Sequence, residues 1–296
     1  MLLTIFTPTY NRANTLGRLY QSLSRQTVAD FEWIIVDDGS TDDTEQLVAG
    51  WISEGLVPIK YYYQPNAGKP MAHNRGVQEA SGELFCCVDS DDYLKRDAVE
   101  QITYAWRGLS DDTVIGLLAF RCDTLGNPIT IIHDSVCRST LRAAYKRHGM
   151  HGDTMLIYRT SIIRKYEFPS IEGERFIPEG YLYNKLDREG ELQILPDCIY
   201  ICDYQDDGYT ANVSKLIFDN YKSYILHLNT RIEEVDTPLE QFLDSIRYDA
   251  IAIAHSMSGI VFNAANRPLA LLALLPGYLL YWYRYRVFNQ TAYNKQ

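Results

Sequence analysis

The chain has 296 residues, with 38 acidic and 28 basic side chains and a formal net charge of −10 at pH 7. DNA and RNA favour proteins with a basic face, so this balance argues against nucleic acid as a partner. The length suits one α/β core followed by a helical appendage. The first apolar run is short and the six cysteines lack paired zinc-ligand spacing, so we expect no signal peptide and a reduced, cytoplasmic protein.

The first hundred residues alternate between short apolar runs and helical patterns. The runs predict strands at 2–6, 31–36, 59–63 and 84–88, and the helical patterns predict helices at 13–25, 41–51, 69–80 and 93–108. Strands that alternate with helices in this way form a parallel sheet. The loops that follow the strands then meet at one edge, which is where open α/β sheets bind their ligands.

Acidic residues follow two of these strands. Asp89-Ser90-Asp91-Asp92 comes directly after 84–88, and Asp37-Asp38-Gly39-Ser40 comes after 31–36. Two carboxylates one residue apart supply the hard oxygen ligands that Mg²⁺ and Mn²⁺ prefer. A metal held there can neutralise a diphosphate leaving group as a bond breaks.

The second half of the chain carries a weaker pattern. It predicts strands at 114–122, 129–132, 154–158 and 199–201, helices at 160–165 and from about 178, and long helices at 213–233 and 238–265. The apolar segment 268–288 is barely as long as the ~20 residues that a membrane span needs, and Pro276-Gly277 interrupts it. Tyrosines and a tryptophan near its end precede two arginines, which favours peripheral contact with a membrane. A helix packed on the catalytic domain and a true span are the alternatives.

Four motifs together resemble the family 2 glycosyltransferases. They are Thr7-Pro8-Thr9-Tyr10-Asn11-Arg12, Val36-Asp37-Asp38-Gly39-Ser40, Asn66-Ala67-Gly68-Lys69 with Asn74, and Asp89-Ser90-Asp91-Asp92. The resemblance implies an inverting enzyme of the GT-A fold, an α/β fold whose mostly parallel, Rossmann-like sheet is flanked by helices. It implies a catalytic domain at 1–211, with a nucleotide-sugar-binding half at 1–110 and an acceptor-side half at 111–211. A helical C-terminal region follows at 212–296.

The resemblance also assigns roles in binding the donor. The Thr7-Pro8-Thr9 backbone and the Tyr10 side chain would frame the nucleotide base, and Asp38 would accept a hydrogen bond from a uracil imide. Lys69 would meet the nucleotide or its phosphates, with a solvated surface lysine as the alternative. Asn74 would support the acidic loop. Within that loop, Asp89 and Ser90 belong to the donor site, Asp91 would bind Mn²⁺ or Mg²⁺, and Asp92 would cap the next helix.

An inverting displacement needs a carboxylate base near the acceptor hydroxyl. Relatives carry it in the second half of the domain, at the start of a helix, and Glu179 stands in that context. The alternative for Glu179 is a carboxylate that interacts with the helix dipole. Asp153, Glu172 and Glu174 compete for the role of base, and 206–210 is interpreted as acceptor-side or structural.

The leading interpretation is a metal-assisted glycosyltransferase that uses a UDP-sugar. Its acceptor would be a hydroxyl of a polysaccharide or a lipid-linked glycan at the inner face of the cell membrane. One alternative is a non-catalytic nucleotide-sugar-binding protein, which should have lost the acidic pair or Glu179. Another is a sugar nucleotidyltransferase, a class that prefers a glycine-rich loop where Thr7-Pro8-Thr9-Tyr10 stands.

Overall fold

The computed structural model describes residues 1–109, 111, 113–203, 213–235 and 237–288. The chain divides into two compact units, one formed by 1–167 and 185–205 and the other by 168–184 and 206–296. Residues 168–184 therefore group with the C-terminal helices, whereas the sequence analysis grouped them with the acceptor-side half. The boundaries at 110 and 211 stay predictions.

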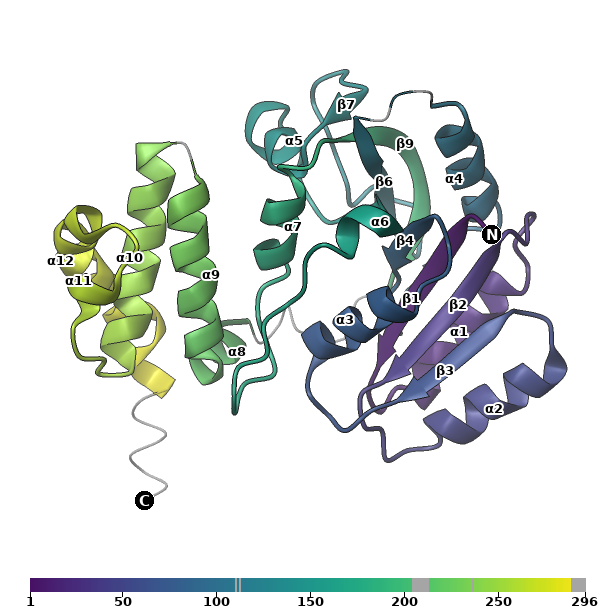
Figure 1. The fold of residues 1–296 in the computed structure, drawn as a ribbon, viewed down its shortest axis with the longest axis horizontal. Helices are drawn as coiled ribbons and strands as arrows, with labels where there is room; N and C mark the ends of the chain where they lie inside the picture. The colour runs from purple at the N-terminus through teal and green to yellow at the C-terminus, as the bar shows by residue number, and fades with distance from the viewer. Residues whose placement is uncertain (110, 112, 204–212, 236, 289–296) are drawn as a thin grey trace. The chain divides into compact units, whose positions relative to one another are not determined.

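The first unit is built on a mixed sheet (Figure 1). Its strands are β1 (Leu3–Thr9), β2 (Phe31–Asp37), β3 (Ile59–Tyr63), β4 (Leu84–Cys87), β5 (Tyr93–Leu94), β6 (Val114–Asp123), β7 (Arg138–Ser139), β8 (Thr154–Arg159) and β9 (Glu191–Cys202). The order is β3-β2-β1-β4-β8-β6-β9-β5, and β7 pairs with β9. The first four strands run parallel, as expected. The antiparallel strand β8 lies between β4 and β6 and makes the sheet mixed.

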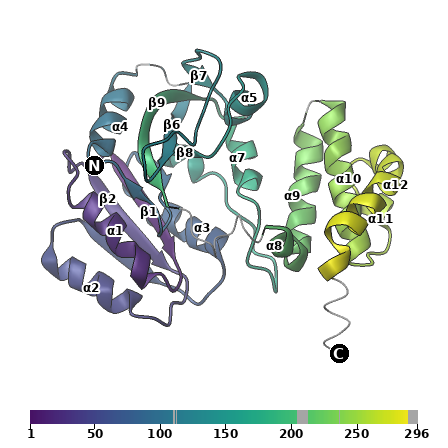
Figure 2. The same cartoon turned by 180° about the vertical axis from the view of Figure 1, so that it is seen from behind.

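Helices cover both faces of the parallel part. They are α1 (Ala13–Leu23), α2 (Thr44–Glu54), α3 (Lys69–Glu79) and α4 (Ala98–Arg107). Leu16 of α1, Val48 of α2 and Ile102 of α4 share one buried cluster with Trp33 of the sheet. On the other face, which is turned toward the viewer in Figure 1 and away from the viewer in Figure 2, α3 lies against β1 and β2. A Cβ on Gly76 of α3 would lie 2.3 Å from the Phe6 ring, so this close approach requires glycine.

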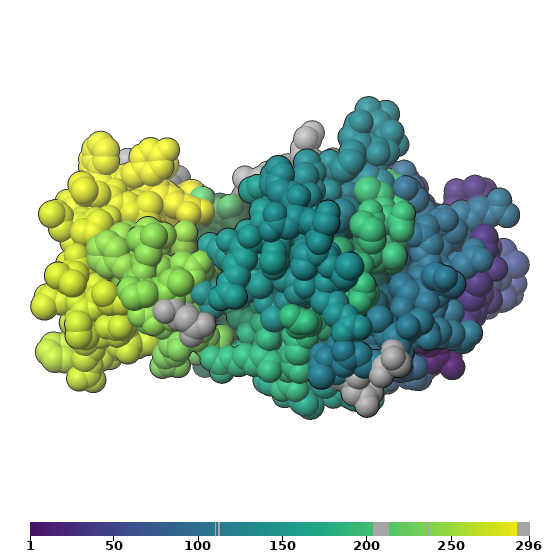
Figure 3. All heavy atoms as spheres, turned by 90° about the horizontal axis from the view of Figure 1, so that it is seen from above, coloured from purple at the N-terminus to yellow at the C-terminus, as the bar shows by residue number. Residues whose placement is uncertain are grey.

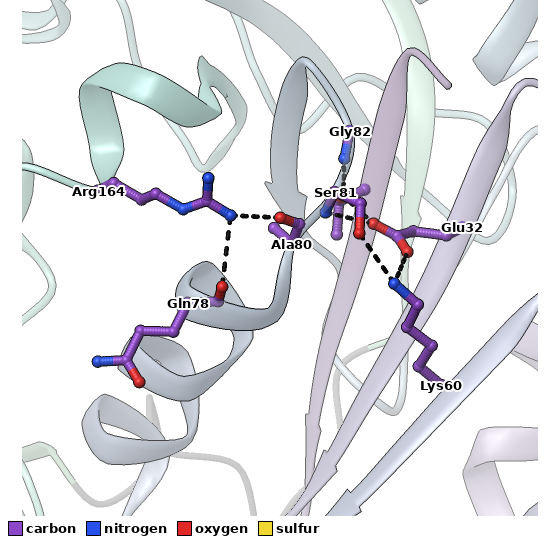
Figure 4. Close-up of polar contacts among 8 residues, drawn as sticks. Glu32, Lys60, Gln78, Ala80, Ser81, Gly82 and Arg164 are labelled. Atoms are coloured by element: carbon purple, nitrogen blue, oxygen red, sulfur yellow. Dashed lines mark hydrogen bonds and ion pairs between the residues drawn. The ribbon is translucent and has the colours of Figure 1, made fainter.

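A buried carboxylate ties the turn between α3 and β4 to the sheet (Figure 4). Glu32 accepts hydrogen bonds from the Thr4 hydroxyl at 2.7 Å and the Ser81 backbone N–H at 2.6 Å, and it pairs with Lys60 at 2.7 Å. Burial raises the pKa of Glu32, but these partners outweigh it and the pKa falls below its usual value. The Arg164 guanidinium donates to the last carbonyls of α3, including that of Ala80. These contacts fix the entry into β4 and therefore the acidic loop that follows it.

Two sequence-based expectations need correction. The expected helix 93–108 begins only at Ala98, because 93–94 form β5, which pairs with β9. The run 129–132 is no regular strand: within it, Ile131 makes a single bridge to His151. After these segments come two short helices, α5 (Leu141–Arg147) and α6 (Thr160–Ile163), of which the sequence indicated the second.

The second unit is helical. Its elements are α8 (Val213–Asp219), α9 (Tyr221–Glu234), α10 (Pro238–Ala254), α11 (Ile260–Asn263) and α12 (Arg267–Arg284), and most of α7 (Gly180–Leu186) also belongs to it. Leu228, Tyr248, Ile251 and Tyr285 form its core. Among the described helices, none combines the length and the hydropathy that crossing a bilayer would take.

Candidate active site

Hydrogen bonds join the loops after β1 and β2. Asn11 adopts a left-handed backbone conformation (φ 53°), its N–H donates to the Ser40 hydroxyl at 2.8 Å, and its side-chain oxygen accepts from the Thr41 N–H at 2.8 Å. The Asp38 N–H donates to the Thr9 carbonyl at 2.8 Å. The structure therefore brings the first two motifs together at the carboxyl ends of parallel strands, as the sequence predicted.

The β1 motif begins with three buried residues and continues with an exposed tyrosine. Thr7, Pro8 and Thr9 are buried within the strand, and the Thr7 hydroxyl accepts from the Trp33 indole N–H at 2.9 Å. Tyr10 is 49% exposed at the end of the strand. The Thr9 hydroxyl is buried without a hydrogen-bond partner among the described residues, which leaves a polar atom for a ligand to satisfy.

Both aspartates of the β2 motif are occupied by the protein itself. Asp37 accepts from the Ser40 N–H and from the Tyr61 hydroxyl, each at 2.7 Å. Asp38 accepts from the Gln64 side chain at 2.8 Å and from the backbone N–H groups of Ala67 and Gly68 at 2.9 and 2.7 Å. A carboxylate has about four acceptor positions. Asp38 therefore shapes the loop before α3, and its contact with a uracil stays a prediction.

The acidic loop after β4 meets the start of α3. Lys69 pairs with Asp89 at 2.7 Å, and this lysine together with Arg121 outweighs the effect of burial and lowers the pKa of Asp89. Burial and the neighbouring Asp89 raise the pKa of Asp91. Lys69 thus neutralises the charge of Asp89, whereas the charged form of Asp91 is less favourable than that of an ordinary aspartate.

This arrangement fits a divalent cation that also binds phosphate. The described residues include no cluster of three His, Cys, Asp or Glu side chains that could hold a metal. Mg²⁺ is typically held by one or two carboxylates together with substrate phosphates, so two aspartates are enough. A cation beside Asp91 would also offset the charge that raises the pKa of this residue.

Residues outside the four motifs support the acidic loop. The Tyr200 hydroxyl of β9 accepts from the Asp89 N–H at 3.1 Å and donates to Asp92 at 2.7 Å. Asp92 also accepts from the Asp203 N–H at 2.8 Å. Asp92 therefore joins the loop to β9, and the helix-capping role expected for it is wrong: α4 begins at Ala98, and no cap bond from Asp92 is present.

Two arginines complete this support. Arg18 of α1 pairs with Asp203 and donates to the Asp91 carbonyl at 3.3 Å. The Arg121 guanidinium lies over the Tyr200 ring, 4.1 Å from its centroid. The sequence analysis missed Arg18, Arg121, Tyr200 and Asp203. A charged residue inside the apolar strand 114–122 is the signal that could have identified Arg121.

The remaining predicted residues have simple placements. Ser90 is buried in the acidic loop, and Asn74 is half-buried on α3. Glu179 is exposed, and its carbonyl accepts from the N–H groups of Leu182 and Tyr183 at the start of α7. It belongs to the second unit, whereas the acidic loop belongs to the first. Its role as the base stays a prediction, as do the donor-binding roles above.

The competing bases differ in their surroundings. Glu174 accepts from the Lys222 N–H at 2.9 Å and from the Ser223 N–H and hydroxyl at 2.7 and 2.6 Å, so it holds the first turn of α9. Glu172 and Asp153 are exposed. The segment 206–210 lies outside the described residues.

Comparison with known proteins identifies the family. Residues 4–166, more than half of the chain, match the family model of glycosyl transferase family 2. The chain belongs to this family. A glycosyltransferase of Haemophilus influenzae, itself uncharacterized, is 31% identical over 181 residues, which are 59% of this chain and 69% of that protein. Membership of this family agrees with the GT-A fold expected from the sequence.

Other relatives are much longer than the chain. An uncharacterized glycosyltransferase of Rickettsia conorii is 38% identical over 98 residues, and the chondroitin synthase of Pasteurella multocida is 39% identical over 99 residues. Each match covers 33% of this chain but only 16% and 10% of the respective relative.

Solved structures confirm the fold. S. aureus TarS 1–349 in complex with UDP-GlcNAc has a TM-score of 0.65 at 19% identity, over 93% of this chain and 80% of that one. The mannosyltransferase PcManGT from Pyrobaculum calidifontis, in complex with GDP-Man and Mn²⁺, has a TM-score of 0.55 at 20% identity, over 92% and 74%. Both of these neighbours were solved with a nucleotide-sugar bound.

Proposed function

We propose that this glycosyltransferase moves a sugar from a UDP-sugar to an acceptor hydroxyl with inversion at the anomeric carbon. The acidic loop carries the proposal: Lys69 is paired with Asp89, and burial together with Asp89 raises the pKa of the neighbouring Asp91, although Arg12 and Lys69 act to lower it. Mn²⁺ or Mg²⁺ held by Asp91 would supply the positive charge that a departing diphosphate needs. The solved neighbours with UDP-GlcNAc and with GDP-Man and Mn²⁺ support a donor and a metal of these classes.

In this proposal the residues of the first unit bind and orient the donor. Tyr10 lies at the end of β1, where an exposed ring can stack on a base, and the buried Thr9 hydroxyl offers an unsatisfied hydrogen bond. Lys69 can shift from Asp89 to a phosphate as a point charge. Glu179, exposed at the start of a helix, would take the proton of the acceptor hydroxyl.

The proposed acceptor is a polysaccharide or a lipid-linked glycan at the cytoplasmic face of the membrane. The match of 99 residues to the chondroitin synthase of Pasteurella multocida supports a glycan acceptor. The apolar C-terminal helix supports a location at the membrane surface.

A donor screen tests this function. The full chain is incubated with UDP-, GDP- and dTDP-sugars and Mn²⁺, with and without candidate glycan acceptors, and the released nucleotide is quantified. We expect metal-dependent release of UDP, with the inverted anomer in the product by NMR. Pyrophosphate release would indicate a nucleotidyltransferase, retained stereochemistry would exclude the single displacement, and tight donor binding without turnover would indicate a non-catalytic binder.

A further inference from the structure

The helix α12 packs with its small residues inward and its large apolar residues outward. Ala270, Ala273 and Gly277 are its buried positions. A Cβ on Gly277 would lie 2.6 Å from the Asp249 Cβ of α10, so the two helices approach too closely for a larger side chain. Glycine is therefore required at position 277, the buried alanines lie on the same side of the helix, and the leucines are left to the opposite side.

The outer face of α12 consists of Leu271, Leu272, Leu275, Leu279, Trp282 and Tyr283. These side chains are between 56% and 82% exposed, and at 3.6 residues per turn they fall within about 120° of the helix circumference. Figure 3 shows the C-terminal residues, in yellow, as a continuous part of the molecular surface. Proteins rarely expose so many contiguous large apolar residues unless another surface covers them.

The charge of this region differs from that of the rest of the chain. Residues 250–296 contain no Asp or Glu, although the chain as a whole has a net charge of −10. Arg267 begins α12 and Arg284 ends it, and the Arg286 guanidinium lies 5.5 Å from the Trp282 ring centroid. A cationic edge around an apolar face complements an anionic lipid surface, whereas two copies of this face would bring like charges together.

The aromatic residues are placed as in membrane interfaces. Tyr278 and Tyr281 precede Trp282 and Tyr283 in the last turns of α12. Amphipathic rings of this kind sit at headgroup depth, and neighbouring arginines reach the lipid phosphates. Pro276 inside the helix and the hydropathy of α12 disfavour a span, so the helix would lie along the surface.

We propose that the outer face of α12 is a docking surface for an anionic lipid bilayer, on which the helix lies without crossing it. This inference rests on the proposed function in one respect: docking would bring the enzyme to a lipid-linked or membrane-bound acceptor. The docking itself depends on α12 and its flanking arginines alone.

Vesicle flotation of the full chain tests the proposal. The probes are phosphatidylcholine vesicles with and without 30% phosphatidylglycerol, at low and high salt. We expect binding to the anionic vesicles that weakens but persists in high salt, because the apolar contribution is insensitive to screening. L272S/L275S should raise the lipid concentration for half-maximal binding at least tenfold, and R267Q/R286Q should remove the preference for anionic lipid.

The matched control is L125S/Y104S, which removes two side chains that are 86% and 84% exposed on the first unit. It should float like the wild type. Absence of wild-type binding to anionic vesicles would overturn the proposal, and so would equal binding of all variants. Concentration-dependent dimers that L272S/L275S abolishes, without flotation, would identify a second copy as the occupant.

Donor turnover without vesicles separates this proposal from the proposed function. L272S/L275S should release nucleoside diphosphate at the wild-type rate in solution. If neither the wild type nor L272S/L275S turns over any donor while the wild type still binds anionic vesicles, the proposed function fails and the docking surface stands.

Discussion

The Tyr200 hydroxyl donates to the Asp92 carboxylate at 2.7 Å and at the same time accepts from the Asp89 N–H at 3.1 Å. One phenol therefore holds both ends of the acidic loop, from a strand more than a hundred residues away. Burial raises the pKa of Tyr200 well above its usual value, so the donor proton is retained at all working pH values.

Tyr200→Phe should loosen the loop without leaving a cavity. We expect the metal concentration for half-maximal activation to rise about tenfold, the size expected for losing a hydrogen bond to a charged group. Tyr20→Phe is the matched control, because Tyr20 is a buried tyrosine whose hydroxyl bonds to Glu54 away from the loop. Equal metal requirements in the two variants would exclude a positioning role for Tyr200.

Asp38→Ala should weaken the binding of all nucleoside diphosphates to a similar extent. The carboxylate already accepts from Gln64, Ala67 and Gly68, so its loss should disorder the loop before α3 rather than remove one contact to the base. Calorimetry with UDP and GDP measures the effect. A loss of affinity confined to UDP would instead support the direct uracil contact that the family resemblance implies.

Glu179→Gln should retain donor and metal binding but lose transfer by about 10²–10⁴-fold, the usual contribution of a general base. Glu233→Gln is the matched control, an exposed carboxylate on α9 of the same unit. Near-normal transfer by Glu179→Gln would place the base elsewhere, with Asp153, Glu172 and Glu174 as the next residues to replace.

Asp249 should make the stability of the chain depend on pH. The carboxyl is fully buried on α10, accepts no hydrogen bond from the described residues, and burial raises its pKa to about 7. The folded pKa lies above the unfolded value of about 3.9, so this group favours the folded state most at low pH, and the benefit is lost as pH rises through 7.

Asp249→Asn should therefore raise the thermal midpoint at pH 8.5 by at least about 2 °C and by clearly less at pH 4, where the carboxyl is largely protonated in the folded state and about half protonated in the unfolded state. Asp219→Asn, on the exposed surface of the same unit, serves as the control and should show the wild-type pH profile. A parallel shift at both pH values would mean that Asp249 is ionised or solvated in the folded state.

Much of the first unit follows from local sequence. The apolar runs and helical periods of residues 1–90 predict β1 to β4 and α1 to α3, because each element carries its own pattern and its own turn residues. The acidic loop and its position after a buried strand follow in the same way. The sequence could not show that 93–94 form a strand, since this pair is fixed by its partner β9.

The supporting residues of the site depend on contacts between distant segments. Nothing near Asp92 in the sequence indicates that its partners are Tyr200 and Asp203, and its place at the end of the acidic loop suggested a helix cap instead. The same limit applies to Lys69, whose ion pair with Asp89 joins two loops twenty positions apart. Length and composition of 268–288 predicted an apolar segment, but only the packing of Gly277 on α10 shows which side chains face outward.

The central claim is that Asp91 holds a divalent cation that assists the departure of a nucleoside diphosphate. The most direct test is a Mn²⁺ titration of UDP-sugar turnover by the wild type and by Asp91→Asn, after both have been treated with EDTA. We predict that the wild type is inactive in chelator and recovers with Mn²⁺ or Mg²⁺, while Asp91→Asn stays folded by circular dichroism and inactive at every metal concentration. Full turnover in EDTA, or a normal metal response in Asp91→Asn, would contradict the account.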